Sequence, residues 1–555
     1  MRRVILVTTI LIMATMIPVG LIKAAPRDPV GPPDRRSGFY SFESFSETIP
    51  SGSSGPGRGT IAGVVCVTST STQPSDFAGN YLLNCDGVGP HNETTIAVNP
   101  NNAANIIAGS HSYLLSVQGN TLTAHIIAAA YASSDGGTSW TNVHPPLGSW
   151  QFTGDPVMFF DGVGRAYFVN LGDHEGQSGA YTNVSVIAQR SDDGGLTWTD
   201  PVTVAAGAGA VSPGGLQVVI FNDKPWGTAD TTGGPRANWV YVTYTRFLFV
   251  HNSYIESPIY FSRSSDGGKT WSVPKEISGS SSTLCTQQVD SSGGASRCDE
   301  NQFSQPVVAA DGTLYVSFFN EQNPASTDFR DQVLVVKSTD GGTTWSGPYA
   351  ASPIIHDGAN DYPLNSDGRQ RLTGCAYRVN ASGALAADPT NSSRLYYTYT
   401  ENQTPGTAGP TQTDIMVVRS DNGGATWSSP IVVNSSAANQ VYSWAAVDGN
   451  GFLRVGYVDH NRPPVGAQTC VYGYTLSTAT SVPAAAFTHS NAETGLSIAS
   501  NSRWFGQNTR FIGDYTNVAV GPDGFVWMDW TDMRQDTTFL GVTRKDQDAV
   551  GMKKP

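Results

Sequence analysis

One eight-residue turn motif, Ser-x-(Asp/Asn)-Gly-Gly-x-(Thr/Ser)-Trp, occurs five times in this chain. Asp-Gly or Asn-Gly between apolar runs supplies the backbone conformations of a tight hairpin, and the closing Trp can pack the turn against its sheet. The copies start 58, 73, 74 and 82 residues apart, so the chain repeats one hairpin-containing unit. They span Ser133–Trp140, Ser191–Trp198, Ser264–Trp271, Ser338–Trp345 and Ser420–Trp427.

Four strand-length apolar segments surround the second copy, at residues 155–161, 166–170, 185–190 and 201–204. Four antiparallel strands per repeat is the pattern of a β-propeller blade. The sequence therefore predicts an all-β propeller of seven four-stranded blades, with six blades as the alternative if a terminal unit is degenerate. The last unit lacks an outer strand, which residues 61–68 would supply to close the ring. The first strands of the seven units are expected to start near Glu93, Asp155, Asp223, Gln302, Gly383, Val441 and Asp514.

The N-terminus has the pattern of an export signal. Arg2 and Arg3 precede an apolar stretch from Val4 to Ile22, and small residues follow it. We therefore expect residues 1–25 to be a signal peptide, although a stretch of this length approaches that of a membrane anchor. Residues 26–59, rich in Pro, Ser and Gly, are expected to form a flexible arm, and residues 60–550 a single propeller domain.

The net charge limits the classes of partner that the protein can bind, and the cysteines indicate its cellular compartment. The formal net charge is −13 and no cluster of Lys and Arg occurs, which argues against a nucleic-acid partner. A secreted, extracellular or periplasmic, protein is expected, monomeric and free of the membrane after signal cleavage. The six cysteines fit an oxidising compartment. Their spacing suggests the pairs Cys66–Cys85, Cys285–Cys298 and Cys375–Cys470, among fifteen pairings that six cysteines allow.

The repeated turn resembles the Asp box of sialidases and of the wider bacterial neuraminidase repeat superfamily. The resemblance covers residues 90–550 as a repeat pattern and implies a sialidase-like β-propeller. It also implies a glycoside hydrolase, an exo-α-sialidase or a related glycosidase, that acts on glycans from the mouth of the propeller channel. Asp boxes lie away from the active site in that superfamily, and non-catalytic propellers carry them too. A propeller that only binds glycans or proteins is therefore the alternative.

Carboxylates recur where the first strands of the units begin, and strand starts converge on the channel of a propeller. Glycoside hydrolysis needs one carboxyl group as acid and a second group as nucleophile or base. Taken in the order of the sialidase family, Asp155 would be the acid/base and Glu300 the partner of the nucleophile Tyr515. Arg371, with Arg454 or Arg510, would hold a sugar carboxylate. Further polar residues expected to contact the substrate are Glu93, Asp223 and Asp514.

The first arginine of the family pattern is missing, because no arginine occurs between Arg58 and Arg165. His91-Asn92-Glu93 occupies its place. A glutamate there would repel a carboxylated sugar, which makes a neutral sugar or another polysaccharide a credible substrate. No Asp-x-Asp-x-Asp-Gly loop, phosphate loop or dinucleotide fingerprint occurs, so neither a metal nor another cofactor is predicted.

Overall fold

The computed structural model contains only β-strands as regular elements within the part of the chain that it describes. The described residues are 45–48, 67–69, 77–84, 89–118, 121–174, 184–211, 217–251, 253–287, 296–323, 330–365, 368–499, 511–539 and 541–555. The predicted signal peptide lies outside them. No helix in these ranges is long and apolar enough to cross a membrane.

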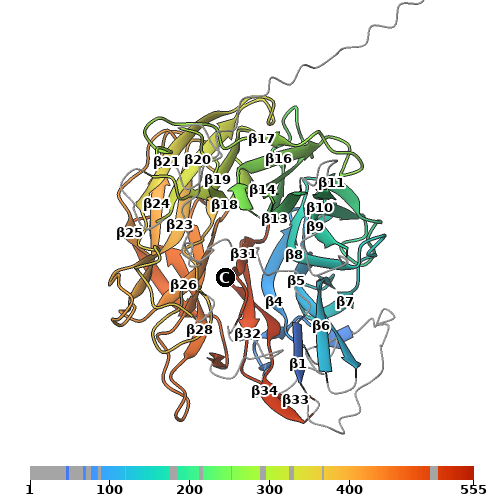
Figure 1. Ribbon diagram of the computed structural model, residues 1–555, viewed down its shortest axis with the longest axis vertical. Coiled ribbons are helices and arrows are strands. Elements are labelled where there is room, and N and C mark those ends of the chain that lie inside the picture. The colour runs from blue at the N-terminus through green and yellow to red at the C-terminus, as the bar shows by residue number, and fades with distance from the viewer. Residues whose placement is uncertain are drawn as a thin grey trace, which may run out of the picture.

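Seven antiparallel sheets follow one another in sequence order around a centre, so the protein is a seven-bladed β-propeller (Figure 1). This confirms the predicted fold class, and the six-bladed alternative is wrong. From inner to outer strand, the first blade consists of β4 (Asn92–Asn99), β5 (Asn102–Gln118), β6 (Thr121–Ser133), β7 (Ser139–Val143) and β2 (Val67–Ser69). The second blade consists of β8 (Phe152–Phe160), β9 (Ala166–Asp173), β10 (Ser185–Ser191) and β11 (Val202–Ala205). The third blade consists of β13 (Gln217–Ala229), β14 (Val240–Val250), β16 (Ile259–Ser264) and β17 (Lys275–Glu276).

The remaining four blades have the same order of strands. They are β18 (Asn301–Val308), β19 (Leu314–Asn320), β20 (Gln332–Ser338) and β21 (Ser346–Ile354); β22 (Leu385–Ala387), β23 (Leu395–Asn402), β24 (Thr413–Ser420) and β25 (Ile431–Val432); β26 (Gln440–Val447), β27 (Leu453–Asp459), β28 (Val471–Ala479) and β29 (Phe487–Asn491); and β31 (Asn517–Val520), β32 (Val526–Asp532), β35 (Asp548–Lys554) and β3 (Tyr81–Leu82).

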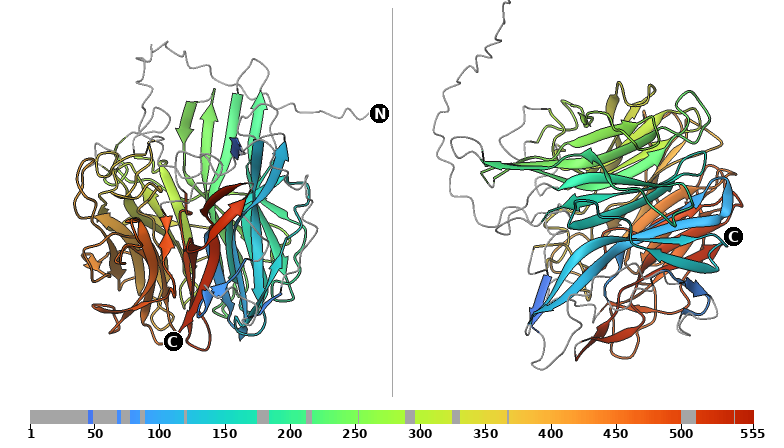
Figure 2. Two further views of the ribbon diagram at one scale, coloured as in Figure 1. Left: turned by 90° about the horizontal axis from the view of Figure 1, so that it is seen from below. Right: turned by 90° about the vertical axis from the view of Figure 1, so that its right-hand side faces the viewer.

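Short additional strands pair with some of the blades. They are β1 (Phe45–Thr48) on β6, β12 (Ala208–Val211) on β13, β15 (Ser253–Glu256) on β14 and β30 (Ser497–Ile498) on β28. Strands β33 (Asp536–Phe539) and β34 (Val542–Lys545) form a separate hairpin. Figure 2 shows that the long strand pairs β5–β6 and β13–β14 reach beyond the rest of the ring. Strand β1 falls within the segment that the sequence predicts to be a flexible arm, and it pairs with the extended part of β6.

The ring closes through an N-terminal strand, as predicted, but through a different segment. Strand β3 pairs with β35 and becomes the outer strand of the seventh blade. The assignment of residues 61–68 to this role is wrong, because residues 67–69 form β2 and pair with β7 of the first blade. Strand β2 thus covers the outer edge of β7, while β3, which lies shortly before β4 in the chain, covers the outer edge of β35.

Two of the predicted disulfides, Cys285–Cys298 and Cys375–Cys470, are confirmed. The proposed pair Cys66–Cys85 lies outside the described residues. The second bridge joins residues separated by 95 positions and ties the loop before the fifth blade to the sixth blade.

The repeated turns are fixed by their own side chains and by the neighbouring blade. In the turn of the third blade, Asp266 accepts hydrogen bonds from Ser264 Oγ at 2.7 Å and from Thr270 N and Oγ1 at 3.0 and 2.6 Å. In the first turn, a Cβ on Gly137 would lie 2.0 Å from Trp527 of the seventh blade. Glycine is therefore required where the turn packs against the adjacent sheet, and these turns hold the blades together.

Loss of the carboxylate acceptor in a turn should destabilise the protein. Burial of Asp266 acts to raise its pKa, but the hydrogen bonds from Thr270 and Ser264 prevail and lower the pKa to about 2. We expect Asp266→Ala to lower the free energy of unfolding by about 1–2 kcal/mol, because it leaves several donors without this acceptor. Asp266→Asn should cost less, since Asn422 makes the same contacts in the fifth copy. Urea unfolding compares them, and equal losses would contradict the acceptor role.

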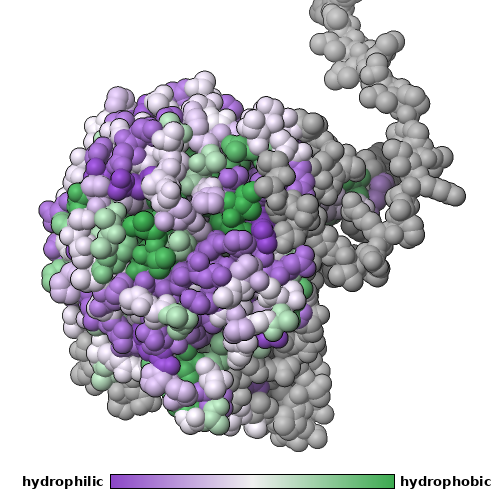
Figure 3. All heavy atoms as spheres, turned by 90° about the vertical axis from the view of Figure 1, so that its left-hand side faces the viewer, coloured by the Kyte–Doolittle hydropathy of each residue, from purple (hydrophilic) through white to green (hydrophobic). Residues whose placement is uncertain are grey.

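The side of the ring shown in Figure 3 is mostly hydrophilic, and its apolar residues lie in small separate groups. Large apolar side chains with substantial exposure occur singly along the chain, among them Val163, Val273 and Phe525. Scattered apolar residues of this kind are usual on a protein surface. The informative polar groups are instead those buried at the centre of the ring.

Candidate functional site

Five of the innermost strands share a bulge near the centre of the ring. In five blades, the first residue of the bulge has a positive φ although it is not glycine. These residues are Glu93 (φ 54°), Asp155 (φ 51°), Lys224 (φ 47°), Phe303 (φ 56°) and Tyr442 (φ 56°), and each precedes the next regular strand pair by two residues. By the same register, the positions in the fifth and seventh blades are Gly383 and Tyr515. We call these seven residues the ring positions.

Five of the seven ring positions have a left-handed backbone. A bulge redirects a side chain out of the regular alternation of a strand, and a non-glycine residue in this region of φ is strained by roughly 1–3 kcal/mol. The recurrence of one strained conformation in five blades is therefore a built feature of the centre of the molecule.

Lys224 lies at the middle of the ring positions. Its Nζ is 3.5 Å from Glu93 Oε1, 4.0 Å from Asp155 Oδ2 and 3.8 Å from the centre of the Tyr515 ring. The ring of Phe303 is 5.7 Å away. These contacts join the first, second, third, fourth and seventh blades, so five of the ring positions form one cluster around a buried ammonium group.

His111 contributes to this cluster from β5. Its Nε2 lies 3.3 Å from Glu93 Oε2 and 3.4 Å from Asp155 Oδ1, and it accepts a hydrogen bond from Asp155 N at 2.7 Å. Its Nδ1 lies 3.2 Å from Asn92 Oδ1. The orientation of the Asn92 amide is set by Gln547, whose Oε1 accepts from Asn92 Nδ2 while its own Nε2 donates to Phe511 O. This chain of hydrogen bonds leaves the His111 proton on Nδ1 and an unprotonated Nε2 toward the carboxylates.

The charges at the centre do not balance. Glu93, Asp155, Asp223 and Asp514 are buried carboxyl groups, and the cations near them include the buried Lys224 and the partly buried Arg378. Arg378 forms a two-bonded pair with Asp514, with distances of 2.9 and 2.6 Å. If every group is ionised, an excess of two negative charges remains, and buried charge without compensation is costly.

The pKa values respond to this excess. Burial raises the pKa of Glu93, and burial together with the charge of Asp155 raises the pKa of Asp223 well above its usual range. Burial acts in the same direction on Asp155, but positive charge, above all that of Lys224 and also that of Arg378, lowers its pKa. Burial acts to lower the pKa of Lys224, yet the charges of Glu93 and Asp155 prevail and raise it.

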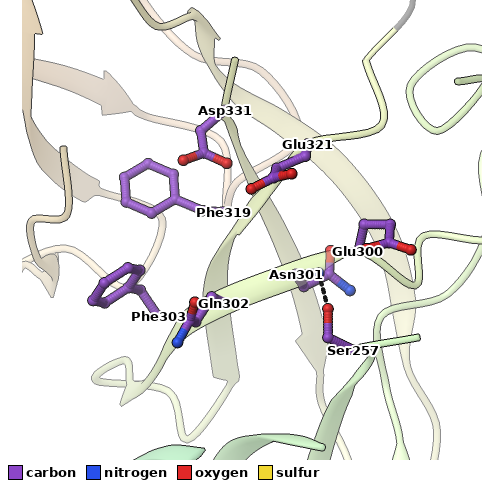
Figure 4. A pocket seen from close by; sticks show the side chains of 8 residues that line it. All are labelled: Ser257, Glu300, Asn301, Gln302, Phe303, Phe319, Glu321 and Asp331. Atoms are coloured by element: carbon purple, nitrogen blue, oxygen red, sulfur yellow. Dashed lines mark hydrogen bonds between the residues drawn. The ribbon is translucent and has the colours of Figure 1, made fainter. Parts of the chain in front are cut away.

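A pocket opens beside this cluster, between the third and fourth blades (Figure 4). Gln302 connects the two features, because its Nε2 donates to Asp223 Oδ2 at 2.7 Å. Figure 4 shows the carboxylates of Glu321 and Asp331 on one side of the pocket, with Glu300 and Asn301 across from them. The pocket is lined by Ser257, Glu300, Asn301, Gln302, Phe303, Phe319, Glu321 and Asp331.

Glu300 is held in place from two sides. The hydroxyl of Tyr254, on β15, donates to Glu300 Oε2 and lies 2.7 Å from Ser257 Oγ. The backbone of Glu300 pairs with that of Ser257 in an isolated parallel bridge. The carboxyl groups of Glu300, Glu321 and Asp331 come from the start of β18, the end of β19 and the start of β20, so one blade presents all three to the pocket.

The structure brings together five of the residues selected from the sequence. Glu93, Asp155 and Tyr515 are ring positions, and Asp223 and Asp514 lie beside them. The hydroxyl of Tyr515 donates to Pro156 O at 3.1 Å, so the tyrosine hydroxyl beside Glu300 is that of Tyr254. Glu300 belongs to the neighbouring pocket rather than to the cluster around Lys224.

Two of the three selected arginines, Arg371 and Arg454, lie elsewhere. Arg371 donates to backbone carbonyls, among them that of Leu364. Arg454 is paired with Asp448 in the turn that joins β26 to β27, at the other end of the inner strand from Tyr442. Arg510 lies outside the described residues. The arginine that does reach the centre is Arg378, from the loop before the fifth blade.

Several residues of the two sites were not selected from the sequence: His111, Lys224, Arg378, Tyr254, Glu321 and Asp331. Lys224 could have been found from the sequence, because it occupies the same position in its inner strand as Asp155 does in the preceding blade. Each lies two residues before the strand pairing resumes, at Trp226 and at Val157. His111 and Arg378 carried no such signal, since neither lies at the start of an inner strand.

No protein-family model and no curated protein matches this chain. Among solved structures, a protein of unknown function from Dyadobacter fermentans is 11% identical, with a TM-score of 0.41, over 72% of this chain and 94% of that one. A mutant of the NanB sialidase from Streptococcus pneumoniae is 9% identical (TM-score 0.41; 86% and 98% covered). The α-L-arabinofuranosidase Arb93A from Fusarium graminearum is 10% identical (TM-score 0.39; 73% and 95%). Likenesses this remote say nothing about the reaction of this chain.

One carboxyl group at the end of β9 should make stability depend on pH. Burial raises the pKa of Asp173 to about 7. Because its folded pKa exceeds the unfolded value, the folded state holds a proton that the unfolded state releases from about pH 4 upward, and stability falls as the pH rises toward 7. Asp173→Asn should therefore raise the free energy of unfolding at pH 8 by about 1–2 kcal/mol, but not at pH 4. Urea unfolding at both pH values tests this, and an equal gain at both would contradict it.

Proposed function

We propose that this protein is a glycoside hydrolase that acts on neutral sugar chains at the pocket lined by Glu300, Glu321 and Asp331. The observation that carries the proposal is the convergence of three carboxyl groups, two amides, one hydroxyl and two phenyl rings on one pocket. Two carboxyl groups are the minimum for acid and nucleophilic or base catalysis on a glycosidic bond. Amide and hydroxyl groups suit the hydroxyl groups of a sugar, and phenyl rings suit its apolar face.

The charge of the pocket favours a neutral substrate. Among the described residues, its lining has three acidic side chains and no basic one. A sialic acid or a uronic acid would bring a further carboxylate next to Glu300, Glu321 and Asp331 without an arginine fork to receive it. The resemblance of the turn motif to sialidases supports an enzyme on glycans, while the pocket supports a substrate other than a sialoside.

The test is hydrolysis of a panel of fluorogenic aryl glycosides by the purified chain. The panel contains neutral pentosides and hexosides, an amino-sugar glycoside, a uronide and a sialoside. We expect release from one or more neutral glycosides and none from the uronide or the sialoside. Turnover of the sialoside alone would contradict the neutral-substrate proposal and favour the sialidase assignment.

The alternative is a propeller that binds glycans without turnover. It predicts no release from any member of the panel together with saturable binding of an oligosaccharide in calorimetry. Substitution of Phe319 or Asn301 would then weaken binding without any rate to measure. That combination of results would replace the hydrolase proposal with a binding function.

A further inference from the structure

The buried cluster next to the pocket has the donor set of a metal site. Glu93, His111 and Asp155 each offer one ligand atom, and these atoms lie within 4.8 Å of one another. All three residues are at most 2% exposed. Neither Glu93 Oε2 nor Asp155 Oδ1, the oxygens that face His111, receives a hydrogen bond within the described part of the chain.

From these contacts we propose that Glu93 Oε2, Asp155 Oδ1 and His111 Nε2 bind one divalent cation of the zinc or manganese class. The proposal is independent of the reaction at the neighbouring pocket. It assigns the cation a structural place at the seam of the first and second blades, because Glu93 and His111 belong to the first blade and Asp155 to the second.

The spacing of the ligand atoms agrees with such a site. The distances from His111 Nε2 to Glu93 Oε2 and to Asp155 Oδ1 are 3.3 and 3.4 Å. Ligands bound at about 2.1 Å in a tetrahedral site lie about 3.4 Å apart. The mixture of one imidazole and two carboxylates selects zinc or manganese over magnesium and calcium, which prefer oxygen ligands alone.

The hydrogen bonds around His111 prepare it as a ligand. Asn92 holds the proton on Nδ1, which is the arrangement that a neighbouring carbonyl imposes on metal-binding histidines. Nε2 therefore carries a lone pair, and Glu93 and Asp155 present two further lone pairs to the same region. Asp155 N now donates to Nε2, so binding of the cation replaces this one hydrogen bond by a coordinate bond.

The charge of the cluster also favours a cation. Lys224 contacts the opposite oxygens, Glu93 Oε1 and Asp155 Oδ2, and leaves the side facing His111 without a positive charge. A divalent cation there offsets the two excess negative charges of the centre. The competing explanation is that protons on the carboxyl groups offset them, and it predicts no stoichiometric metal.

The experiment uses the full chain without a polyhistidine tag, stripped with EDTA, then incubated with one metal ion at a time and dialysed to remove unbound ion. We expect one equivalent of Zn²⁺ or Mn²⁺ by elemental analysis, and a higher melting temperature with either ion than with Mg²⁺ or Ca²⁺. His111→Gln and Glu93→Gln should each weaken binding at least tenfold in competition with a chelator. His489→Gln, at an exposed histidine on the outer strand β29, is the matched control and should leave metal binding unchanged.

A spectroscopic measurement on the unsubstituted protein covers the case in which these variants do not fold. Co²⁺ bound by four or five nitrogen and oxygen ligands absorbs visible light much more strongly than hexaaqua Co²⁺. Addition of one equivalent of Co²⁺ to the protein should therefore produce strong visible absorption bands. Less than 0.1 equivalent of metal with no such bands would overturn the proposal. Stoichiometric binding that both folded ligand variants retain would overturn it as well.

Discussion

Exchange of Glu300 for Gln is expected to lower kcat/KM on a neutral aryl glycoside by about 10²- to 10⁴-fold. Glu300 is 3% exposed, lines the pocket and is fixed by the hydroxyl of Tyr254, so its carboxyl group is positioned rather than free to rotate. The amide of Gln occupies the same volume and still accepts that hydrogen bond. The substitution therefore removes the acid, base or nucleophile while the local structure remains.

The dependence on the leaving group assigns the role of Glu300. A general acid is needed mainly when the departing oxygen is basic, so Glu300→Gln would spare a glycoside with a strongly acidic phenol if Glu300 is the acid. Equal losses on both kinds of glycoside would make it the nucleophile or base. Glu321→Gln and Asp331→Asn, measured in the same way, identify its partner.

The matched control is Glu276→Gln, on the outer strand β17 and paired with Arg297. It should keep the unsubstituted rate. Unchanged kcat/KM in Glu300→Gln, with turnover by the unsubstituted chain, would place the chemistry elsewhere. Asp155→Asn then becomes the informative variant, because the order of residues in the sialidase family assigns Asp155 the acid/base role.

The repeated turn made the fold predictable. A periodic signal reports one supersecondary unit, and each copy contains the hydrogen bonds that define it, so five copies sufficed to locate the blades. The strand that closes the ring was harder to predict from the sequence. Strands β2 and β3 are three and two residues long, and such short strands carry too little alternation to say which edge each one pairs with.

The candidate site was predictable only where it follows the repeat. Glu93 and Asp155 lie at the same register position in successive blades, so reading the starts of the inner strands found them. The pocket residues Glu321 and Asp331 lie after β19 and before β20, where the blades differ from one another. Arg454, which sequence order selected, lies at the opposite end of its blade, because order along the chain does not tell which end of a strand a residue reaches.

The ring positions also make a strong prediction about stability, because the fifth blade fills its place with no side chain. A Cβ on Gly383 would lie 1.8 Å from Thr398 O and 2.5 Å from Thr398 C, both of them backbone atoms of β23. Neither atom can move without breaking the hydrogen bond from Thr398 N to Ala384 O. Gly383→Ala should therefore lower the free energy of unfolding by more than about 4 kcal/mol, or prevent folding.

Gly449→Ala provides the control, since Gly449 lies in the exposed turn at the far end of the sixth blade and a Cβ there meets no atom within 4 Å. It should change the free energy of unfolding by less than about 0.5 kcal/mol. Thermal and urea unfolding distinguish the two variants. Because the seven inner strands share one channel, displacement of the fifth strand by even one methyl group must be taken up by its neighbours. A Gly383→Ala protein as stable as the control would therefore mean that the inner strands are not held as closely as the bulged ring positions require.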